Sequence, residues 1–241
     1  MTKLSNQITG AKGAEYSDAP QGSPEWIALR PCRIGASELH PWMLRALVTD
    51  KETKVKTRTG AYLSGRKGLE RQKAFEKAFN VSFSRYVTGA MQEGIDNEAF
   101  VRDQYAQQMK VEVVKAGSFY DKWSIASPDG LVGTDGGIEI KWLQDTNWTE
   151  VVETNRPLEE HYYQIQGNLR LSGRKWWDYV AANGNTGRFV VITIERDEEL
   201  IAEIDREVRT VEDIAPLEPS NIFQFTETVP AAQLESGDVW A

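Results

Sequence analysis

Asp129, Glu139 and Lys141 fall within residues 127–141, and their types and spacing could support metal-dependent chemistry. The composition of this segment predicts a β-hairpin, because the Thr-Asp-Gly-Gly run at residues 134–137 tolerates the positive φ of a tight turn. The hairpin would carry Asp129 back beside Glu139 and Lys141. Two carboxylates in one polar pocket provide the hard oxygen ligands that suit Mg²⁺ or Mn²⁺.

A strand over residues 137–142 would direct these side chains, since successive residues of a strand point to opposite faces. Ile138 and Ile140 would lie on one face, and Glu139 and Lys141 on the other. A lysine beside two acids should stay protonated, because nearby anions favour the ammonium. The same alternation is also typical of a half-solvated edge strand with no site at all.

The composition describes an ordinary globular protein and excludes several other classes. Of the 241 residues, 40% are hydrophobic and 10% aromatic, and no apolar run reaches the length of a membrane span. The polar N-terminus lacks the apolar core of a signal sequence. A single cysteine, Cys32, excludes an internal disulfide and fits a reducing cytoplasm. Two histidines, His40 and His161, argue against histidine-based zinc or triad chemistry.

The order of predicted elements indicates one α/β domain over residues 23–217, with a central mixed sheet flanked by helices. Residues 1–22 are interpreted as a flexible tail and residues 218–241 as a C-terminal tail. Ser23, Pro24 and an acid begin a short helix. Further helices are predicted over residues 61–79, 92–109, 145–152, 158–171 and 198–211, strands over residues 111–114, 118–125, 176–182 and 189–194, and a polar loop over residues 48–60.

Two of these helices carry polar residues on a face that should turn inward. In the helix over residues 92–109, Ile95, Ala99, Phe100 and Tyr105 have helical spacing, which would place Glu98 near an apolar side. A carboxylate in that position is costly unless it is paired or bound to a metal.

On the helix over residues 158–171, His161, Gln164 and Asn168 share one face, with Gln166 elsewhere. Of the first three, we interpret His161 as a spectator.

An anion-binding position is predicted near the N-terminus. Gly35 and the following alanine permit a tight turn, and Ser37 could cap the helix that follows. An exposed helix N-terminus beside Arg30 and Arg33 would suit a phosphate. A surface ion pair for Arg30 and a plain helix cap for Ser37 are the alternatives.

Seven ordered stretches resemble the lambda-type phage exonuclease (viral recombinase) family of the PD-(D/E)XK nuclease superfamily. The Ser-Pro-Asp-Gly-Leu and Gly-Ile-Glu-Ile-Lys stretches form the nuclease core pattern, and five others narrow the match. These stretches occupy residues 127–131, 137–141, 26–30, 34–37, 94–98, 162–166 and 194–198. The sequence departs from the family at Trp142 and Leu143 after the lysine, which predicts a reshaped pocket rim, and at the bulky residues 41–43.

The resemblance implies roles for individual residues. Asp129 and Glu139 would bind Mg²⁺, which Mn²⁺ could replace, together with the backbone carbonyl of Ile140. Glu98 would complete the metal shell directly or through water. Lys141 would position or help to deprotonate the attacking water and stabilise the developing negative charge.

Three further residues receive roles from the same resemblance. Gln164 would orient the nucleophile or the catalytic lysine. Arg30 and Ser37 would hold the 5′-phosphate at the DNA end.

Members of this family are Mg²⁺-dependent 5′→3′ exonucleases that degrade one strand of linear duplex DNA and leave a 3′ overhang. The resemblance also implies a ring-shaped homotrimer, a single-strand annealing protein as partner, and a phage protein acting in the bacterial cytoplasm. The alternatives are a PD-(D/E)XK endonuclease or repair nuclease without a ring, and a non-catalytic DNA-end-binding module.

The charge distribution fits a ring with a basic channel. The formal net charge of −8 argues against indiscriminate binding of nucleic acid, yet residues 30–73 contain 11 basic and 4 acidic side chains. A solvated loop of mixed charge is the alternative interpretation. The residues that we expect to line the channel are Lys51, Lys54, Lys56, Arg58, Arg66 and Lys67.

Overall fold

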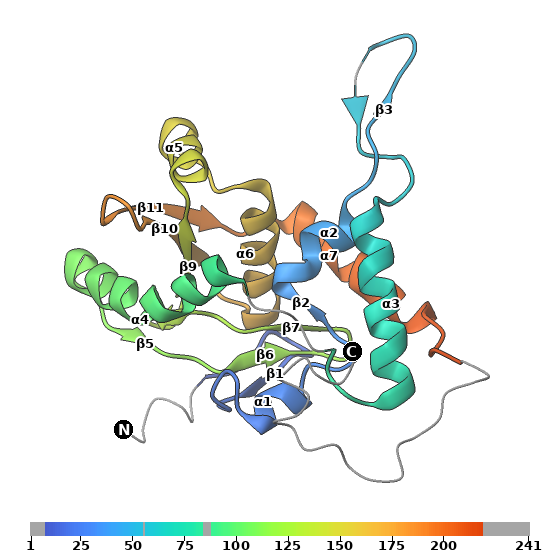
Figure 1. Ribbon diagram of the computed structural model, residues 1–241, viewed down its shortest axis with the longest axis horizontal. Helices are drawn as coiled ribbons and strands as arrows, with labels where there is room; N and C mark the ends of the chain where they lie inside the picture. The colour runs from blue at the N-terminus through green and yellow to red at the C-terminus, as the bar shows by residue number, and fades with distance from the viewer. Residues whose placement is uncertain (1–7, 55, 84–87, 219–241) are drawn as a thin grey trace, which may run out of the picture.

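A five-stranded sheet carries the predicted hairpin at its centre (Figure 1). The computed structural model describes residues 8–54, 56–83 and 88–218. The sheet has the order β11-β10-β9-β8-β5, with β9 and β10 parallel and the other neighbours antiparallel. Its strands are β5 (Val113–Val114), β8 (Gly130–Val132), β9 (Gly136–Leu143), β10 (Trp176–Asn183) and β11 (Arg188–Glu195). Because β9 has neighbours on both sides, the edge-strand alternative is excluded.

The five-stranded sheet is the central mixed sheet of the prediction, and a second sheet, which was not predicted, has the order β1-β6-β7-β2. It consists of β1 (Glu15–Ser17), β2 (Ile34–Gly35), β6 (Ser118–Tyr120) and β7 (Ser124–Ala126). The strand predicted over residues 118–125 is a tight hairpin, because the Asp121 carboxylate accepts bonds from the amides of Trp123 and Ser124 and reverses the chain.

The N-terminal tail prediction is wrong for the segment that forms β1. This strand pairs with β6, and the ring of Tyr16 lies 5.0 Å from that of Phe119. The aromatic contact is long-range, which is why the local composition of this polar segment does not predict it. The C-terminal tail lies, apart from residue 218, outside the described residues.

Seven α-helices and two 3₁₀ segments cover the sheets in the described part of the chain. They are α1 (Pro24–Ala28), η2 (Ala36–Glu38), α2 (Leu39–Met43), α3 (Ser64–Phe79), α4 (Gly89–Met109), α5 (Asp145–Thr154), α6 (Glu159–Ser172), α7 (Glu198–Arg209) and η3 (Thr210–Asp213). Ser23 caps α1 as predicted, and Gly173 ends α6 in the left-handed conformation that suits glycine. None of these helices combines the length and apolar character needed to cross a bilayer.

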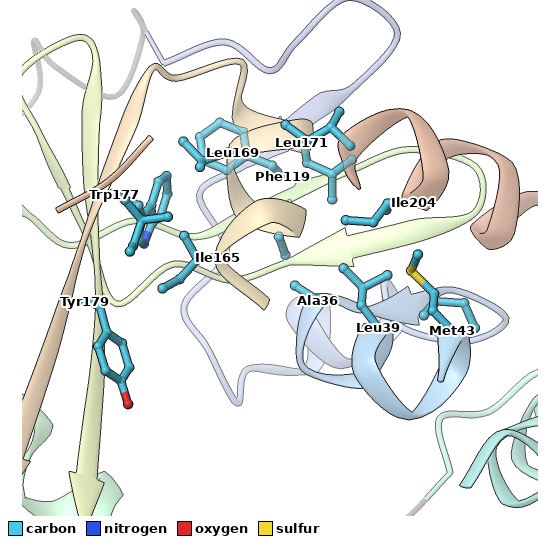
Figure 2. Close-up of a cluster of buried hydrophobic side chains, with 14 of the residues drawn as sticks. Ala36, Leu39, Met43, Phe119, Ile165, Leu169, Leu171, Trp177, Tyr179 and Ile204 are labelled. Carbon is cyan, nitrogen blue, oxygen red and sulfur yellow. The ribbon is translucent and has the colours of Figure 1, made fainter. Parts of the chain in front are cut away.

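The main core forms around α6, which is packed between the sheets and helices α2 and α7 (Figure 2). Ile165 and Leu169 of α6 are fully buried, and Leu39 and Ile204 approach them from α2 and α7. Burying such side chains stabilises the fold by about 2 kcal/mol each. The neighbouring polar face of α6, which carries Gln164 and Asn168, is thereby fixed toward β9.

Two glycines at the start of β9 allow it to lie against the tryptophans of β10. A Cβ at Gly136 would be 2.1 Å from the ring of Trp176, and one at Gly137 would be 2.5 Å from the ring of Trp177. The turn consequently lies one residue earlier than predicted, and Gly133 (φ +52°) takes the left-handed position in it.

Helix α4 packs on β9, and its predicted inner face is confirmed only in part. Ile95 and Phe100 are 57% and 59% exposed, whereas Val101 and Tyr105 are buried. Tyr105 belongs to the predicted set, but contact with Ile138 and its neighbours on β9 buries Val101 beside it and leaves Ile95 and Phe100 exposed.

The loop predicted over residues 48–60 contains a small hairpin, formed by β3 (Val48–Thr49) and β4 (Lys56–Thr57). We call it the arm, and it stands away from the body of the molecule in Figure 1. Its root is held by the Glu207 clamp, in which the Glu207 carboxylate accepts bonds from Arg45 (3.0 Å), Tyr62 (2.6 Å) and Arg66 (3.0 Å).

Candidate active site

One cavity of about 520 Å³ brings together the side chains that were predicted to form the site, which come from five separate segments of the sequence. Its wall is formed by strands β2, β7 and β9, helices α1, α4 and α6, segment η2 and the residues just before β8. The predicted catalytic and phosphate-binding residues in its lining are Asp129, Glu139, Lys141, Glu98, Gln164, Arg30 and Ser37, together with Ile140. We call it the active-site cavity.

Glu139 is the most constrained carboxylate of this cavity, with 1% of its surface exposed. Its Oε1 accepts bonds from Lys141 Nζ (2.7 Å) and Gln164 Nε2 (2.6 Å). Its Oε2 accepts a bond from Asn168 Nδ2 (2.9 Å). Gln164 Oε1 in turn accepts from Lys141 Nζ (3.0 Å). The four side chains form a closed network in which α6 orients both the acid and the lysine of β9.

Asp129 lies immediately before β8 and is tied to β9 by its Oδ2, which accepts a bond from the Ile140 amide (2.6 Å). Burial raises the pKa of the Asp129 carboxyl well above its ordinary value, and the Glu139 carboxylate raises it further. Burial alone opposes the charged form of Lys141, yet the carboxylates of Glu139 and Asp129 raise the pKa of this lysine above its ordinary value. Lys141 is therefore protonated, as its two acidic neighbours predict.

The residues in this cavity fit a divalent cation. Glu139 is buried and Asp129 is half-buried beside it, the Glu139 carboxylate disfavours the charge of Asp129, and a cation between them would remove that conflict. A carboxylate pair with a nearby backbone carbonyl is a set of hard oxygen donors of the kind that Mg²⁺ and Mn²⁺ prefer.

The predicted third carboxylate, Glu98, is engaged elsewhere. It forms an ion pair with Arg102, whose Nε donates to the Asp129 backbone carbonyl at 2.7 Å. Within the described ranges, no three His, Cys, Asp or Glu side chains gather closely enough to hold a metal. In this arrangement the Glu98 carboxylate is paired with its i,i+4 neighbour on α4, and its charge acts on Asp129.

Arg30 faces the same cavity from the end of α1. Its guanidinium carbon lies 4.4 Å from the centre of the Trp26 ring, and Trp26 Nε1 donates to Ser127 Oγ at 2.9 Å. Among the described residues, no carboxylate forms an ion pair with Arg30, so the surface ion-pair alternative is wrong for this part of the chain. Burial lowers the pKa of Arg30 while Glu76 opposes that effect, and the side chain is a partly desolvated cation.

Ser37 lines the cavity and is exposed, but it does not cap a helix. It lies inside η2, whose N-cap is Gly35, and the Gly35 amide donates to the Glu38 carboxylate at 2.8 Å. The buried Glu38 carboxylate accepts the bond from the N-cap amide, and the Ser37 hydroxyl is left at the cavity wall.

The predicted channel residues divide into two groups. Arg66 is 5% exposed and belongs to the Glu207 clamp, so its assignment to a DNA channel is wrong. The reason is a contact between residues 141 positions apart, which local charge density does not reveal. Five of the residues are exposed, four of them on the arm and one on α3: Lys51, Lys54, Lys56, Arg58 and Lys67.

The structure adds residues that the sequence reasoning left without a role. Asn168 holds Glu139, and its i,i+4 spacing from Gln164 was the available signal. Arg102 links Glu98 to the Asp129 backbone, and Ser127 joins Trp26 at the cavity wall. His161 is absent from the lining; its Nδ1 is 2.7 Å from the Tyr179 hydroxyl, and burial lowers its pKa to about 3.

Trp142, the departure from the family pattern, also lines the cavity, and a Cβ added at Gly94 would lie 3.7 Å from the Trp142 Cβ. The other bulky departure, Trp42, is fully buried and donates to the Glu207 carbonyl at 2.9 Å. The first residue shapes the site and the second stabilises the scaffold.

Comparisons with known proteins agree with this site. The model of the YqaJ-like viral recombinase domain matches residues 25–175, a range that includes all the cavity residues named above. No curated protein matches the chain significantly. Similar solved structures include the alkaline exonuclease LHK-Exo from Laribacter hongkongensis, at 27% identity and a TM-score of 0.66, over 79% of this chain and 91% of that one.

A second structure of LHK-Exo, in complex with dAMP, superposes equally well, with a TM-score of 0.67 over the same shares of the two chains and the same 27% identity. A phage-related exonuclease from Haemophilus somnus 129PT shares the fold at 14% identity, with a TM-score of 0.55 over 76% of this chain and 92% of that one.

Proposed function

We propose, from the premise that this chain belongs to the YqaJ-like viral recombinase domain family, that it is a metal-dependent 5′→3′ exonuclease on linear double-stranded DNA. The single observation that carries the proposal is the convergence of Asp129, Glu139, Lys141 and Gln164 in one cavity with the cation of Arg30 at its wall. The family membership and the likeness to exonucleases of known structure support the nuclease chemistry.

Hydrolysis of a phosphodiester requires a water positioned in line with the departing oxygen, and stabilisation of the extra negative charge. Asp129, Glu139 and the Ile140 carbonyl would hold Mg²⁺ or Mn²⁺, which when bound would lower the pKa of water and neutralise charge on the phosphate. Glu98 would support this shell through water or by positioning, because Arg102 occupies its carboxylate.

Lys141 is the donor that this chain aims at the reacting groups. Its ammonium is fixed by Glu139 and Gln164 and still has a face on the cavity, so it would orient the water and stabilise charge on the phosphoryl oxygens. Neutralising the two neighbouring acids would lower the pKa of Lys141 and make proton transfer from the water easier.

Arg30 and Ser37 would bind the terminal 5′-phosphate. A guanidinium that has no ion-pair partner among the described residues and is partly desolvated provides a strong site for a phosphate. Holding the end in the same cavity as the two acids would place the first phosphodiester near the reacting groups. The dAMP bound to LHK-Exo supports release of nucleoside monophosphates as products here.

The exposed arm lysines and arginine would follow the DNA backbone, with the 3′-ended strand left as an overhang for a single-strand annealing protein. A homotrimeric ring would reconcile the net charge of −8 with a basic channel. The homotrimer and the annealing partner both rest on the family resemblance, and sedimentation equilibrium of the free protein tests the homotrimer.

The test is digestion of a linear duplex labelled on one strand, with 5′-phosphate or 5′-hydroxyl ends, in Mg²⁺ or EDTA. We expect Mg²⁺-dependent release of mononucleotides from the 5′-phosphorylated strand, and none from Asp129→Ala. Cleavage of closed circular DNA would instead indicate the endonuclease alternative. Binding of ends without any cleavage would indicate the end-binding module.

A further inference from the structure

A second cavity, of about 280 Å³, lies behind the Arg30 position. Arg30 and Trp26 line both this cavity and the active-site cavity, so they form the partition between them. The wall behind the partition contains Glu38, Lys73 and Glu76, each only 3% exposed. Charged side chains are rarely buried unless they are paired or functional, so three of them next to a proposed phosphate site indicate a role in the fold or the chemistry.

Lys73 is the centre of this group. Its Nζ lies 3.0 Å from Glu76 Oε2 and 3.5 Å from Glu38 Oε2, so one ammonium bridges two carboxylates from different elements. Lys73 and Glu76 lie on α3, whereas Glu38 lies in η2. The bridge therefore connects the long helix to the segment that carries Ser37.

Each of the two carboxylates holds a backbone amide of the loop between α1 and η2. Glu76 Oε2 accepts from the Cys32 amide at 2.8 Å, and Glu38 Oε2 accepts from the Gly35 amide at 2.8 Å. Cys32 has φ of +63°, a left-handed conformation that is unfavourable for a residue with a Cβ. Such a conformation persists where the surroundings hold it in place.

The clamped loop begins at Arg30 and ends at Ser37, which are the two residues proposed to bind the phosphate. A Cβ at Gly35 would lie 3.4 Å from Arg30 Nη2 and 3.5 Å from Glu38 Oε2, so the guanidinium lies against the clamped turn. The Glu76 charge also acts on Arg30. A shift of the turn would therefore move the guanidinium relative to the acids on β9.

We propose that Lys73 is a positioning residue, which bridges Glu38 and Glu76 to fix the loop over residues 30–37 and thereby sets the preference of the enzyme for a phosphorylated DNA end. This inference rests on the proposed function. Lys73 lies in the same basic segment of the sequence as the exposed arm lysines. Its role under this proposal is selectivity for the DNA end and not contact with the DNA backbone.

The experiment compares kcat and KM on linear duplexes that differ only in a 5′-phosphate or a 5′-hydroxyl end. The variants are Lys73→Gln and the double variant Lys73→Gln, Glu76→Gln. The double variant removes one charge of each sign. The amide oxygen that Glu76→Gln introduces can still accept a bond from the Cys32 amide. The matched control is Lys77→Gln on the same helix, whose ammonium bonds the carbonyls of Val211, Glu212 and Ile214 on the other side. Thermal melting identifies the temperature at which every variant is folded.

We expect both Lys73 variants to lose about tenfold or more of the phosphate-to-hydroxyl ratio in kcat/KM, mainly through KM for the phosphorylated end. The control should keep the wild-type ratio at a comparable loss of melting temperature. A wild-type ratio in either folded Lys73 variant overturns the proposal, and the double variant decides if the single one does not fold. If wild type and Arg30→Ala show no preference to begin with, the proposed end recognition itself is wrong, which is a separate result.

Discussion

The active-site cavity and the Glu207 clamp differ in how the charges of their carboxylates are compensated. In the active-site cavity, the buried Glu139 lies beside the half-buried Asp129, and desolvation with repulsion from Glu139 raises the pKa of Asp129. In the Glu207 clamp, burial alone would raise the pKa of Glu207, but bonds from Tyr62, Arg45 and Arg66 lower it. The clamp carboxylate is paired with arginines within the chain, whereas the cavity places the single ammonium of Lys141 beside two acids, whose repulsion a cation from solution would relieve.

The difference indicates which group serves the scaffold and which serves the chemistry. A fully paired cluster stabilises one arrangement, here the root of the arm. A cluster of like charges costs folding free energy and is retained where a ligand or reaction uses it. Mutations that remove one acid from each group should therefore have opposite effects on stability and activity.

The largest expected effect is on the turnover of Asp129→Asn. Nuclease activity should fall by at least about 1,000-fold, because the cation site loses one of its two carboxylates. The melting temperature in EDTA should rise, since the amide oxygen can still accept from the Ile140 amide while the buried charge is gone. Calorimetry beside the digestion assay checks both effects, and a less stable variant would contradict this view of the cavity.

Glu207→Gln should show the reverse pattern. Loss of the carboxylate leaves Arg66 and Arg45 without their shared anion and should lower the free energy of unfolding by about 3 kcal/mol. Turnover of the folded enzyme should stay near that of the wild type at low temperature. Denaturant titration measures the first quantity, and an unchanged midpoint would show that the clamp is not needed.

The stability of Asp129→Asn and of Glu207→Gln relative to wild type should depend on pH in different ways. The folded-state pKa of Asp129 is raised, so wild-type stability in EDTA falls as the pH rises above the unfolded value of about 3.9. The folded-state pKa of Glu207 is lowered, so its stabilisation is present above its unfolded value of about 4.3 and is lost as the pH falls through the folded pKa. Urea denaturation from about pH 2 to about pH 7 should therefore separate the two variants. The loss for Glu207→Gln should grow as the pH rises to about 4.3 and then stay constant, whereas the gain for Asp129→Asn should begin to grow only above about pH 3.9.

Asn168→Ala tests the support behind the cavity and not the acids themselves. Glu139 would lose the donor to its Oε2 but keep Lys141 and Gln164 on its Oε1. We expect activity to fall about tenfold, with a higher Mg²⁺ requirement, as is typical when a partner of a metal ligand is removed. Titration of activity against Mg²⁺ is the measurement, and wild-type behaviour would mean that Gln164 alone orients the acid.

The smallest effect per residue is expected on the arm. Replacing Lys51, Lys54 and Lys56 by Gln should reduce the slope of log affinity against log salt by about 0.9 for each phosphate that the arm no longer neutralises. Exposed Lys110 and Lys115 provide a matched control away from the arm. Equal slopes for the two sets would show that the arm does not contact the DNA backbone.

The sequence predicted the central hairpin, the polar face of β9 and most of the helices because these depend on short-range rules. Side-chain alternation placed Glu139 and Lys141 together, and i,i+4 spacing placed Gln164 and Asn168 on one face of α6. The inner face of α4 was predicted correctly for Tyr105 but wrongly for Ile95 and Phe100, because only packing against β9 distinguishes these two residues from Val101.

By itself the sequence determined the chemistry that this chain can perform, since the residue types and their spacing on strand and helix are local properties. Tertiary structure decided which charges are available for that chemistry. Arg66 and Lys73 belong to the same basic segment as the arm lysines, yet they are buried against Glu207 and against Glu38 with Glu76. The physical reason is that the free energy of a charge depends on its partners in space, and the partner of Arg66 lies 141 residues away along the chain.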